Sequence, residues 1–261
     1  MTDLKTVQQP EMQGEESQLK GVRAMIFAAG LGTRLKPFTD AHPKALAPVN
    51  GKPLLQRNIE YLMYFGIRDI IVNVHHFAEQ IKDFLREKED FSCRIQISHE
   101  IGELLETGGG LLHAAWFLAA NKEPFVVMNA DILTNLDLGK MYAHHKQSAP
   151  IATLAVTNRK SSRNLLFDEE MRLCGWTNQN TGEMRMAFTP EKTPDPFAFS
   201  GIHVIDPEIF TMIRQTGKFS IIDSYLDLAA THQIQGYRHS RDIIVDVGRP
   251  ESIIEAERFF Q

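Results

Sequence analysis

Residues 22–34 read VRAMIFAAGLGTR, and this stretch decides the fold of the 261-residue chain. The apolar run at 22–29 predicts a buried strand, and a glycine loop directly after a strand offers closely spaced backbone N–H groups to an anion. Arg34 in that loop, and Lys44 in the following PKALAPV at 43–49, add permanent positive charge. The stretch therefore predicts a phosphate site. It is not a P-loop, since no Gly-Lys-Ser/Thr follows, and the third glycine of a dinucleotide fingerprint is missing.

Strand-like apolar runs alternate with segments of helical period along most of the chain. This pattern predicts an α/β fold, a three-layer sandwich with a mostly parallel mixed sheet of the Rossmann-like kind. Predicted strands are 24–29, 69–74, 94–98, 125–129, 151–157, 164–167, 172–176, 199–205 and 243–246; predicted helices are 54–65, 78–88, 110–120, 138–146, 220–231 and 251–260. Ligands of such sheets collect beyond the carboxyl ends of the strands.

Residues 1–21 are predicted to be a flexible N-terminal extension, because they are polar, rich in Gln and Glu, and lack the apolar core of a signal peptide. Residues 22–261 are predicted to form a single domain. Within it, residues 178–196 have no clear period and are interpreted as a mobile loop or an edge hairpin. The sequence leaves open whether that segment forms an ordered part of a ligand site.

Composition excludes several classes of function. Lys and Arg number 28 against 33 Asp and Glu, a net charge of −5, so no general basic surface is expected to hold nucleic acid. No apolar run approaches the roughly 20 residues needed to cross a bilayer. Cys93 and Cys174 form no Cys-x-x-Cys pair, which favours the reducing cytoplasm. Nothing in the sequence specifies an oligomeric state.

Two carboxylates follow predicted strands. Asp131 comes just after the run 125–129, and Asp246 lies in VDVG at 245–248. Carboxylate oxygens are ligands that Mg²⁺ takes beside phosphates, so the pair could hold a magnesium ion. Each aspartate alone is equally well explained as a turn or capping residue.

The stretch from Ala28 to Pro48 resembles the signature of the sugar-1-phosphate nucleotidyltransferase family: small residues, Gly-x-Gly-Thr-Arg, a proline, then Pro-Lys and a further proline. The resemblance implies Mg²⁺-dependent transfer of a nucleotidyl group from a nucleoside triphosphate to a sugar 1-phosphate, with release of pyrophosphate. It implies catalytic roles for Arg34 and Lys44, and metal binding by Asp131 and Asp246. Ala130 stands where the family often has glycine. The implied nucleotide contacts are Ala28, Ala29, Gly30, Gly32, Thr33, Glu100, Thr107 and Gly108, and the implied sugar contacts are Ser200 and Gly201.

Substrate choice within the family is less firmly indicated. The segment LETGGG at 105–110, the segment FSGI at 199–202 and the short remainder after Asp246 are most similar to members that use UTP and N-acetylmuramate 1-phosphate in cell-wall sugar recycling. A mannose- or heptose-1-phosphate guanylyltransferase is the alternative, and a nucleotide- or sugar-binding regulatory module without turnover is an alternative of another class. The carboxylate of a lactyl ether calls for either a cation or free backbone N–H groups near the sugar-facing strand. Arg159, Lys160 and Arg163 follow the predicted strand 151–157 and could supply the cation; an exposed basic turn explains them about as well.

Overall fold

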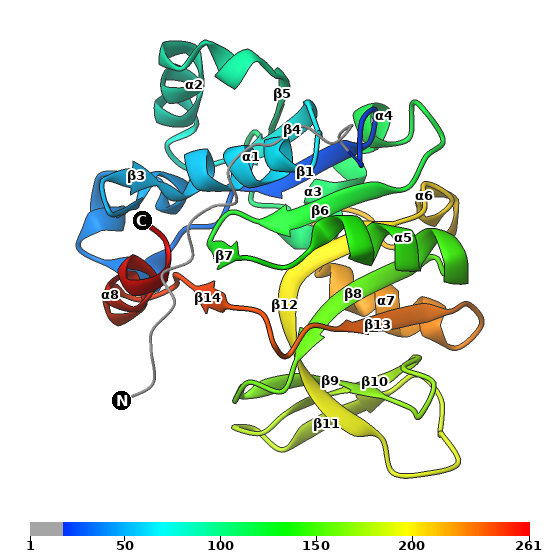
Figure 1. Cartoon of the computed structure of the whole chain (residues 1–261). Helices are drawn as coiled ribbons and strands as arrows, with labels where there is room; N and C mark the ends of the chain where they lie inside the picture. Colours follow the sequence, from blue (N-terminus) through cyan, green and yellow to red (C-terminus); the bar gives the residue numbers. More distant parts are fainter. Residues whose placement is uncertain (1–17) are drawn as a thin grey trace. The chain divides into compact units, whose positions relative to one another are not determined.

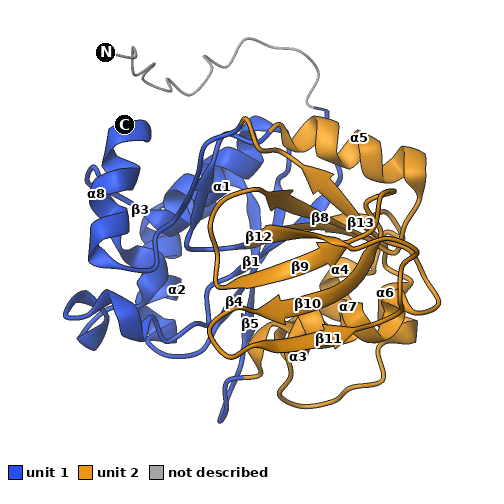
Figure 2. Cartoon of the chain, turned by 90° about the horizontal axis from the view of Figure 1, so that it is seen from below, with its two compact units in different colours: residues 1–104, 129–136, 242–261 blue, residues 105–128, 137–241 orange. Residues whose placement is uncertain are grey.

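The computed structural model describes residues 18–261, which form two compact units (Figures 1 and 2). Unit 1 comprises the chain up to Leu104 together with Asn129–Leu136 and Asp242–Gln261, and unit 2 comprises Leu105–Met128 and Asp137–Arg241. The chain thus passes between the units four times. The prediction of a single domain over 22–261 remains a prediction.

Unit 1 is built on three parallel strands in the order β1 (Arg23–Phe27), β4 (Asp69–Val74) and β5 (Arg94–His99). The middle of β1, Ala24 to Ile26, is completely buried, as expected for a strand covered on both faces. Two helices connect these strands: α1 (Leu54–Tyr64) and α2 (Ala78–Glu87).

A second set of elements in unit 1 surrounds a separate apolar cluster. The elements are a short hairpin, β2 (Pro48–Val49) and β3 (Lys52–Pro53); an antiparallel pair, β7 (Ile132–Thr134) and β14 (Ile244–Asp246); and α8 (Pro250–Phe259). The cluster contains Leu35, Ala47, Val49, Leu54, Leu133, Val245, Val247 and Ala256. Five of them, Leu35, Ala47, Leu133, Val245 and Val247, lie within three residues of Arg34, Lys44, Asp131 or Asp246 in the sequence. Packing of the cluster therefore fixes the backbone that carries those four charged side chains.

Unit 2 has a mixed sheet centred on the long strand β12 (Asp195–Ile205), drawn yellow in Figure 1. β12 pairs antiparallel with β6 (Phe125–Asn129), β8 (Ala152–Thr157) and β9 (Arg163–Phe167). The remaining strands are β13 (Ile234–Arg238), parallel to β8, and β10 (Leu173–Asn178) with β11 (Glu183–Met186), which extend the sheet beyond β9. The helices are α3 (Glu106–His113), α4 (Ala115–Leu118), α5 (Leu138–Ser148), α6 (Ile209–Met212) and α7 (Ile221–Ala229).

The α/β class and the mixed sheet predicted from the sequence are confirmed, and most elements begin and end within a few residues of their predicted bounds. The segment 178–196 contains β11, which pairs with β10, so the hairpin interpretation is the observed one. One prediction was wrong: the expected helix 110–120 is two helices, and α3 already begins at Glu106. The glycine run 108–110 is therefore helical.

The first 17 residues of the predicted extension lie outside the described residues. Within the described part, Leu19 is buried and its N–H donates to the Phe65 carbonyl at 3.0 Å, so ordered packing begins before residue 22. Over residues 18–261 the structure contains no helix with the length and apolar character that crossing a bilayer requires.

Candidate active site

The loop after β1 is fixed in position by hydrogen bonds to its neighbours in unit 1. The Ala28 N–H donates to Asn73 Oδ1 at 2.7 Å, and the Gly32 carbonyl accepts from Thr39 Oγ1 at 2.9 Å. Gly32 has φ +63°, and a Cβ there would lie 2.8 Å from both Lys44 Cβ and Thr39 Cγ2. Only glycine fits this approach, which brings the Gly30–Arg34 loop against the segment that carries Lys44.

Lys44 and Asp131 form an ion pair between Nζ and Oδ2. Their side chains are 13% and 24% exposed, so solvent screens the pair only partly. The backbone next to Asp131 is fixed twice: the Ala130 carbonyl accepts from Asn58 Nδ2 at 2.8 Å, and the Ala130 N–H donates to the Phe27 carbonyl at 3.0 Å. Asp131 is thus positioned directly beyond the end of β1.

The segment that carries Asp246 is joined to the Asp131 loop by a backbone hydrogen bond, and Arg34 lies beside the same segment. The Val247 N–H donates to the Asp131 carbonyl at 2.8 Å, which joins the end of β14 to the Asp131 loop. A Cβ on Gly248 would lie 2.8 Å from Asp246 Oδ1 and 2.9 Å from Arg34 Nη2. Unit 1 therefore gathers the four predicted charged residues, two cations and two carboxylates, around the glycine loop.

Asp246 Oδ1 is a buried oxygen without a hydrogen-bond partner anywhere in residues 18–261. A buried acceptor left without a donor costs roughly 1–3 kcal/mol, so such an atom calls for an explanation. The described residues contain no group of three or more His, Cys, Asp or Glu side chains that could enclose a metal ion. Two carboxylates do suffice for Mg²⁺, which keeps waters and phosphate oxygens among its ligands.

Glu100 follows β5 and lies 2% exposed in unit 1. Its Oε1 accepts from Asn73 Nδ2 at 2.7 Å, while the other end of the same amide, Oδ1, accepts from the Ala28 N–H. Asn73 therefore links the loop after β1 to Glu100. Sequence reasoning missed Asn73; the signal was a lone buried amide near the end of an otherwise apolar strand, DIIVNV at 69–74.

Thr107 and Gly108 have structural partners in unit 2. Thr107 Oγ1 accepts from the Ile221 N–H at 3.0 Å, at the start of α7. A Cβ on Gly108 would lie 2.1 Å from Phe219 Cε2, so the absence of a side chain allows helix α3 to pack against the Phe219 ring. The glycine run therefore lies inside a packed helix. A nucleotide contact from Thr107 and Gly108 stays a prediction.

Ser200 and Gly201 lie in β12 where its pairing with β8 shifts register, between Phe199 and His203. Gly201 has φ +70°, a conformation that glycine adopts without strain. Ser200 is completely buried, and its Oγ shares a 2.7 Å hydrogen bond with His239 Nε2. Burial, helped by the charge of Arg159, lowers the pKa of His239 to about 4, so this imidazole is neutral at pH 7. The sugar contact of Ser200 and Gly201 stays a prediction.

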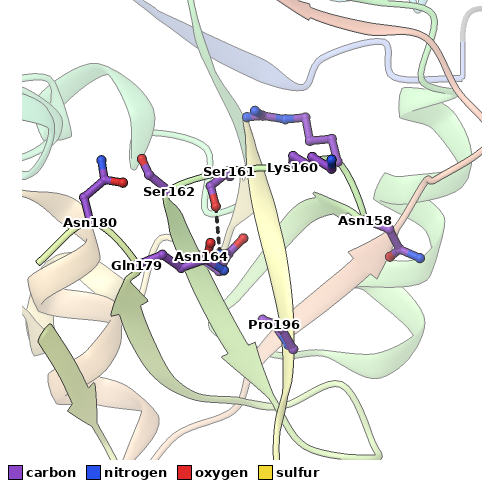
Figure 3. A pocket seen from close by; sticks show the side chains of 9 residues that line it. Asn158, Lys160, Ser161, Ser162, Asn164, Gln179, Asn180 and Pro196 are labelled. Carbon is purple, nitrogen blue, oxygen red and sulfur yellow. Dashed lines mark hydrogen bonds between the residues drawn. The ribbon is translucent and has the colours of Figure 1, made fainter. Parts of the chain in front are cut away.

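A cavity of about 570 Å³ opens in unit 2 beside the loop that follows β8 (Figure 3). Its lining consists of Asn158, Arg159, Lys160, Ser161, Ser162, Asn164, Gln179, Asn180 and Pro196. Arg163 is not among these residues, although it follows the same strand. The amide side chains of this pocket come from two segments, 158–164 and 179–180, that the antiparallel pairing of β9 with β10 brings together, so the sequence alone did not indicate them.

The chain belongs to the nucleotidyl transferase family, which it matches over residues 23–261. It is 31% identical over 246 residues to N-acetylmuramate alpha-1-phosphate uridylyltransferase of Caulobacter vibrioides, which covers 90% of this chain and 95% of that protein. It is 29% identical over 241 residues to mannose-1-phosphate guanylyltransferase catalytic subunit beta of Drosophila pseudoobscura pseudoobscura, with 90% of this chain but 61% of that protein covered.

Among solved structures, HddC from Yersinia pseudotuberculosis complexed with GMP-PN has the same fold, with a TM-score of 0.73 and 23% identity over 92% of this chain and 100% of that one. The protein is a sugar-1-phosphate nucleotidyltransferase, as the sequence predicted. The alternative of a binding module without turnover is thereby set aside.

Proposed function

We propose that this enzyme transfers a uridylyl group from UTP to N-acetylmuramate 1-phosphate, giving UDP-N-acetylmuramate and pyrophosphate. The observation that carries the reaction is the cluster of Arg34, Lys44, Asp131 and Asp246 around the Gly30–Arg34 loop. Support for the substrates comes from the relative of that name, which this chain matches along nearly the whole length of both proteins.

In the proposed reaction, a phosphate oxygen of the sugar 1-phosphate attacks the α-phosphorus of UTP. One P–O bond forms, and the bond from the α-phosphorus to the bridging oxygen of the β-phosphate breaks, so pyrophosphate leaves with the electron pair. The attacking oxygen is already ionised at neutral pH, and no strong base is needed. The protein therefore has to position the reactants and balance negative charge.

Arg34 and Lys44 differ in what they offer to the triphosphate. The planar guanidinium of Arg34 suits two phosphate oxygens of the departing pyrophosphate. The ammonium of Lys44 is a point charge paired with Asp131, and the Lys44 side chain starts beside the loop, where its Cβ lies close to Gly32. We assign it to the α-phosphate, where charge moves during the reaction.

Asp131 and Asp246 are the residues that would hold Mg²⁺. The unpartnered buried oxygen of Asp246 and the partly exposed carboxylate of Asp131 fit such an ion. Bound there, Mg²⁺ would supply positive charge to the phosphate oxygens. The nucleotide itself would be bound by the loop from Ala28 to Thr33 and by Glu100; the Ala28 N–H is already used by Asn73, so backbone donors would come from the later residues of that loop.

The pathway and compartment follow from the proposed substrates. We assign the enzyme to the recycling of peptidoglycan sugars in the cytoplasm. Both cysteines are free, and burial raises the pKa of Cys93 and raises that of Cys174 to about 11, which favours unreactive thiols.

A guanylyltransferase acting on mannose 1-phosphate is the second candidate, favoured by the 29% identity over 90% of the chain. The two candidates are separated by pyrophosphate release from UTP, dTTP, CTP, GTP and ATP, each with several sugar 1-phosphates and Mg²⁺. We expect kcat/KM for UTP with N-acetylmuramate 1-phosphate to exceed that for GTP with mannose 1-phosphate by at least about tenfold. Fastest turnover with GTP and mannose 1-phosphate would overturn the choice of substrate but not the reaction class.

A further inference from the structure

Eight of the nine residues that line the pocket after β8 are polar or charged. The lining contains two cationic side chains, four amides and two hydroxyls, with no carboxylate and no aromatic ring. In Figure 3 the side chains of Ser162, Asn164, Gln179 and Asn180 lie on the same side of β12. Amides and hydroxyls hydrogen-bond to a polyhydroxylated ligand, and unopposed positive charge favours an anion. The pocket is therefore matched to a sugar that carries an acidic group.

Arg159 supplies the specific donor. Its Nη2 donates to the Phe199 carbonyl at 2.9 Å, which anchors the guanidinium on β12 one residue before Ser200. Its Nε is buried and has no hydrogen-bond partner in the described part of the chain. No ion pair to Arg159 is formed among residues 18–261 either. The guanidinium is half-buried and has a buried N–H without an acceptor, so a bound ligand could supply that acceptor.

Thr157 adds a second unused group nearby. It is 4% exposed at the end of β8, where it pairs with Ala198 of β12, and its Oγ1 has no partner in residues 18–261. His239 does not compete as a cation, because burial lowers its pKa to about 4. The positive charge at this point of unit 2 thus belongs to Arg159 and its neighbour Lys160.

We propose that Arg159 binds a carboxylate on the sugar of the acceptor substrate and so selects a sugar bearing an acidic ether. This proposal rests on the proposed function. A guanidinium offers adjacent N–H groups in a planar fork that matches the two oxygens of a carboxylate. The sequence indicated three basic residues for this role. Arg159 and Lys160 line the pocket, and Arg163 does not.

The test compares two acceptors that differ only in the lactyl ether: N-acetylmuramate 1-phosphate and N-acetylglucosamine 1-phosphate, each with UTP. In Arg159→Ala we expect kcat/KM to fall roughly 10- to 100-fold with the lactyl sugar and less than about threefold with the other. Arg159→Lys keeps the charge and should restore part of the preference. Arg163→Ala, at the start of β9 and outside the pocket lining, is the matched control and should leave both values unchanged.

The ratio between acceptors is measured within one variant, so a folding defect lowers both values and cannot produce the expected selective loss. An equal loss on both acceptors in the well-folded Arg159→Lys variant would assign Arg159 to the shared phosphate or ring and overturn the proposal. A wild-type enzyme without preference for the lactyl sugar would overturn it as well, while any nucleotidyl transfer to other sugar 1-phosphates would leave the reaction class standing.

Discussion

Lys44 and Asp131 lie 87 residues apart in the sequence, yet their side chains pair directly beside the glycine loop of unit 1. The pair places a cation assigned to the α-phosphate in contact with a carboxylate assigned to the metal. Each partner compensates the charge of the other when no substrate is present. Removing one of them therefore changes the electrostatics of the other, and variants of the two residues should not be additive.

The cations are expected to serve turnover rather than folding. Arg34→Ala and Lys44→Ala should each lower kcat/KM by about 100-fold or more, since each removes charge aimed at phosphate oxygens in the transition state. Thermal unfolding should change little. Lys36→Ala is the control, because Lys36 lies in the same segment with its side chain 61% exposed. Activity within a few-fold of wild type in a folded Arg34 or Lys44 variant would remove that residue from the mechanism.

The carboxylates are expected to set the magnesium requirement. Asp131→Asn and Asp246→Asn should each raise the Mg²⁺ concentration at half-maximal activity, because each loses a charged oxygen ligand. Excess chelator should abolish activity of the wild-type enzyme. Asp40→Asn, an exposed aspartate paired with Lys36, should behave as wild type. Wild-type turnover that persists in chelator would contradict the metal assignment.

Substitutions at two glycines are expected to have different effects: one on stability through packing, the other on ligand binding. Gly108→Ala should lower Tm by about 3–10 °C, because the new Cβ clashes with the Phe219 ring and overpacking costs roughly 1–3 kcal/mol. Gly30→Ala should leave Tm unchanged, since apart from its chain neighbours no atom of residues 18–261 lies within 4 Å of that Cβ. The variant should raise the KM for UTP if the triphosphate occupies the space. An unchanged Tm in Gly108→Ala would refute the packing explanation of the glycine run.

Buried neutral histidines should make the protein less stable in mild acid. Burial lowers the pKa of His145 to about 4, of His203 to about 3 and of His239 to about 4, against about 6.5 in an unfolded chain. Between those values the unfolded chain binds more protons, so stability is complete above pH 6.5 and falls as the pH drops below it. We expect Tm to decline from pH 6.5 to 5, and His203→Gln to make the decline shallower. A flat Tm profile over that range would contradict this.

The sequence predicted the strands of the core and the four charged residues of unit 1 because both carry local signals. Apolar runs mark β1 and β4, and the spacing of Gly32, Arg34 and Lys44 marks the loop. The helical state of Gly108 could not be predicted, since glycine favours loops locally and only the contact with Phe219 explains it. The role of Asn73 and the pocket around Arg159 also depend on partners distant in sequence.

The most direct test of the proposed function is a competition assay with the wild-type enzyme. UTP and GTP at equal concentration are mixed with N-acetylmuramate 1-phosphate and mannose 1-phosphate at equal concentration and Mg²⁺, and the nucleotide sugars formed early are identified by mass. Their ratio reports the ratio of kcat/KM values. We predict that UDP-N-acetylmuramate exceeds GDP-mannose by at least about tenfold. GDP-mannose as the main product would contradict the proposed substrates.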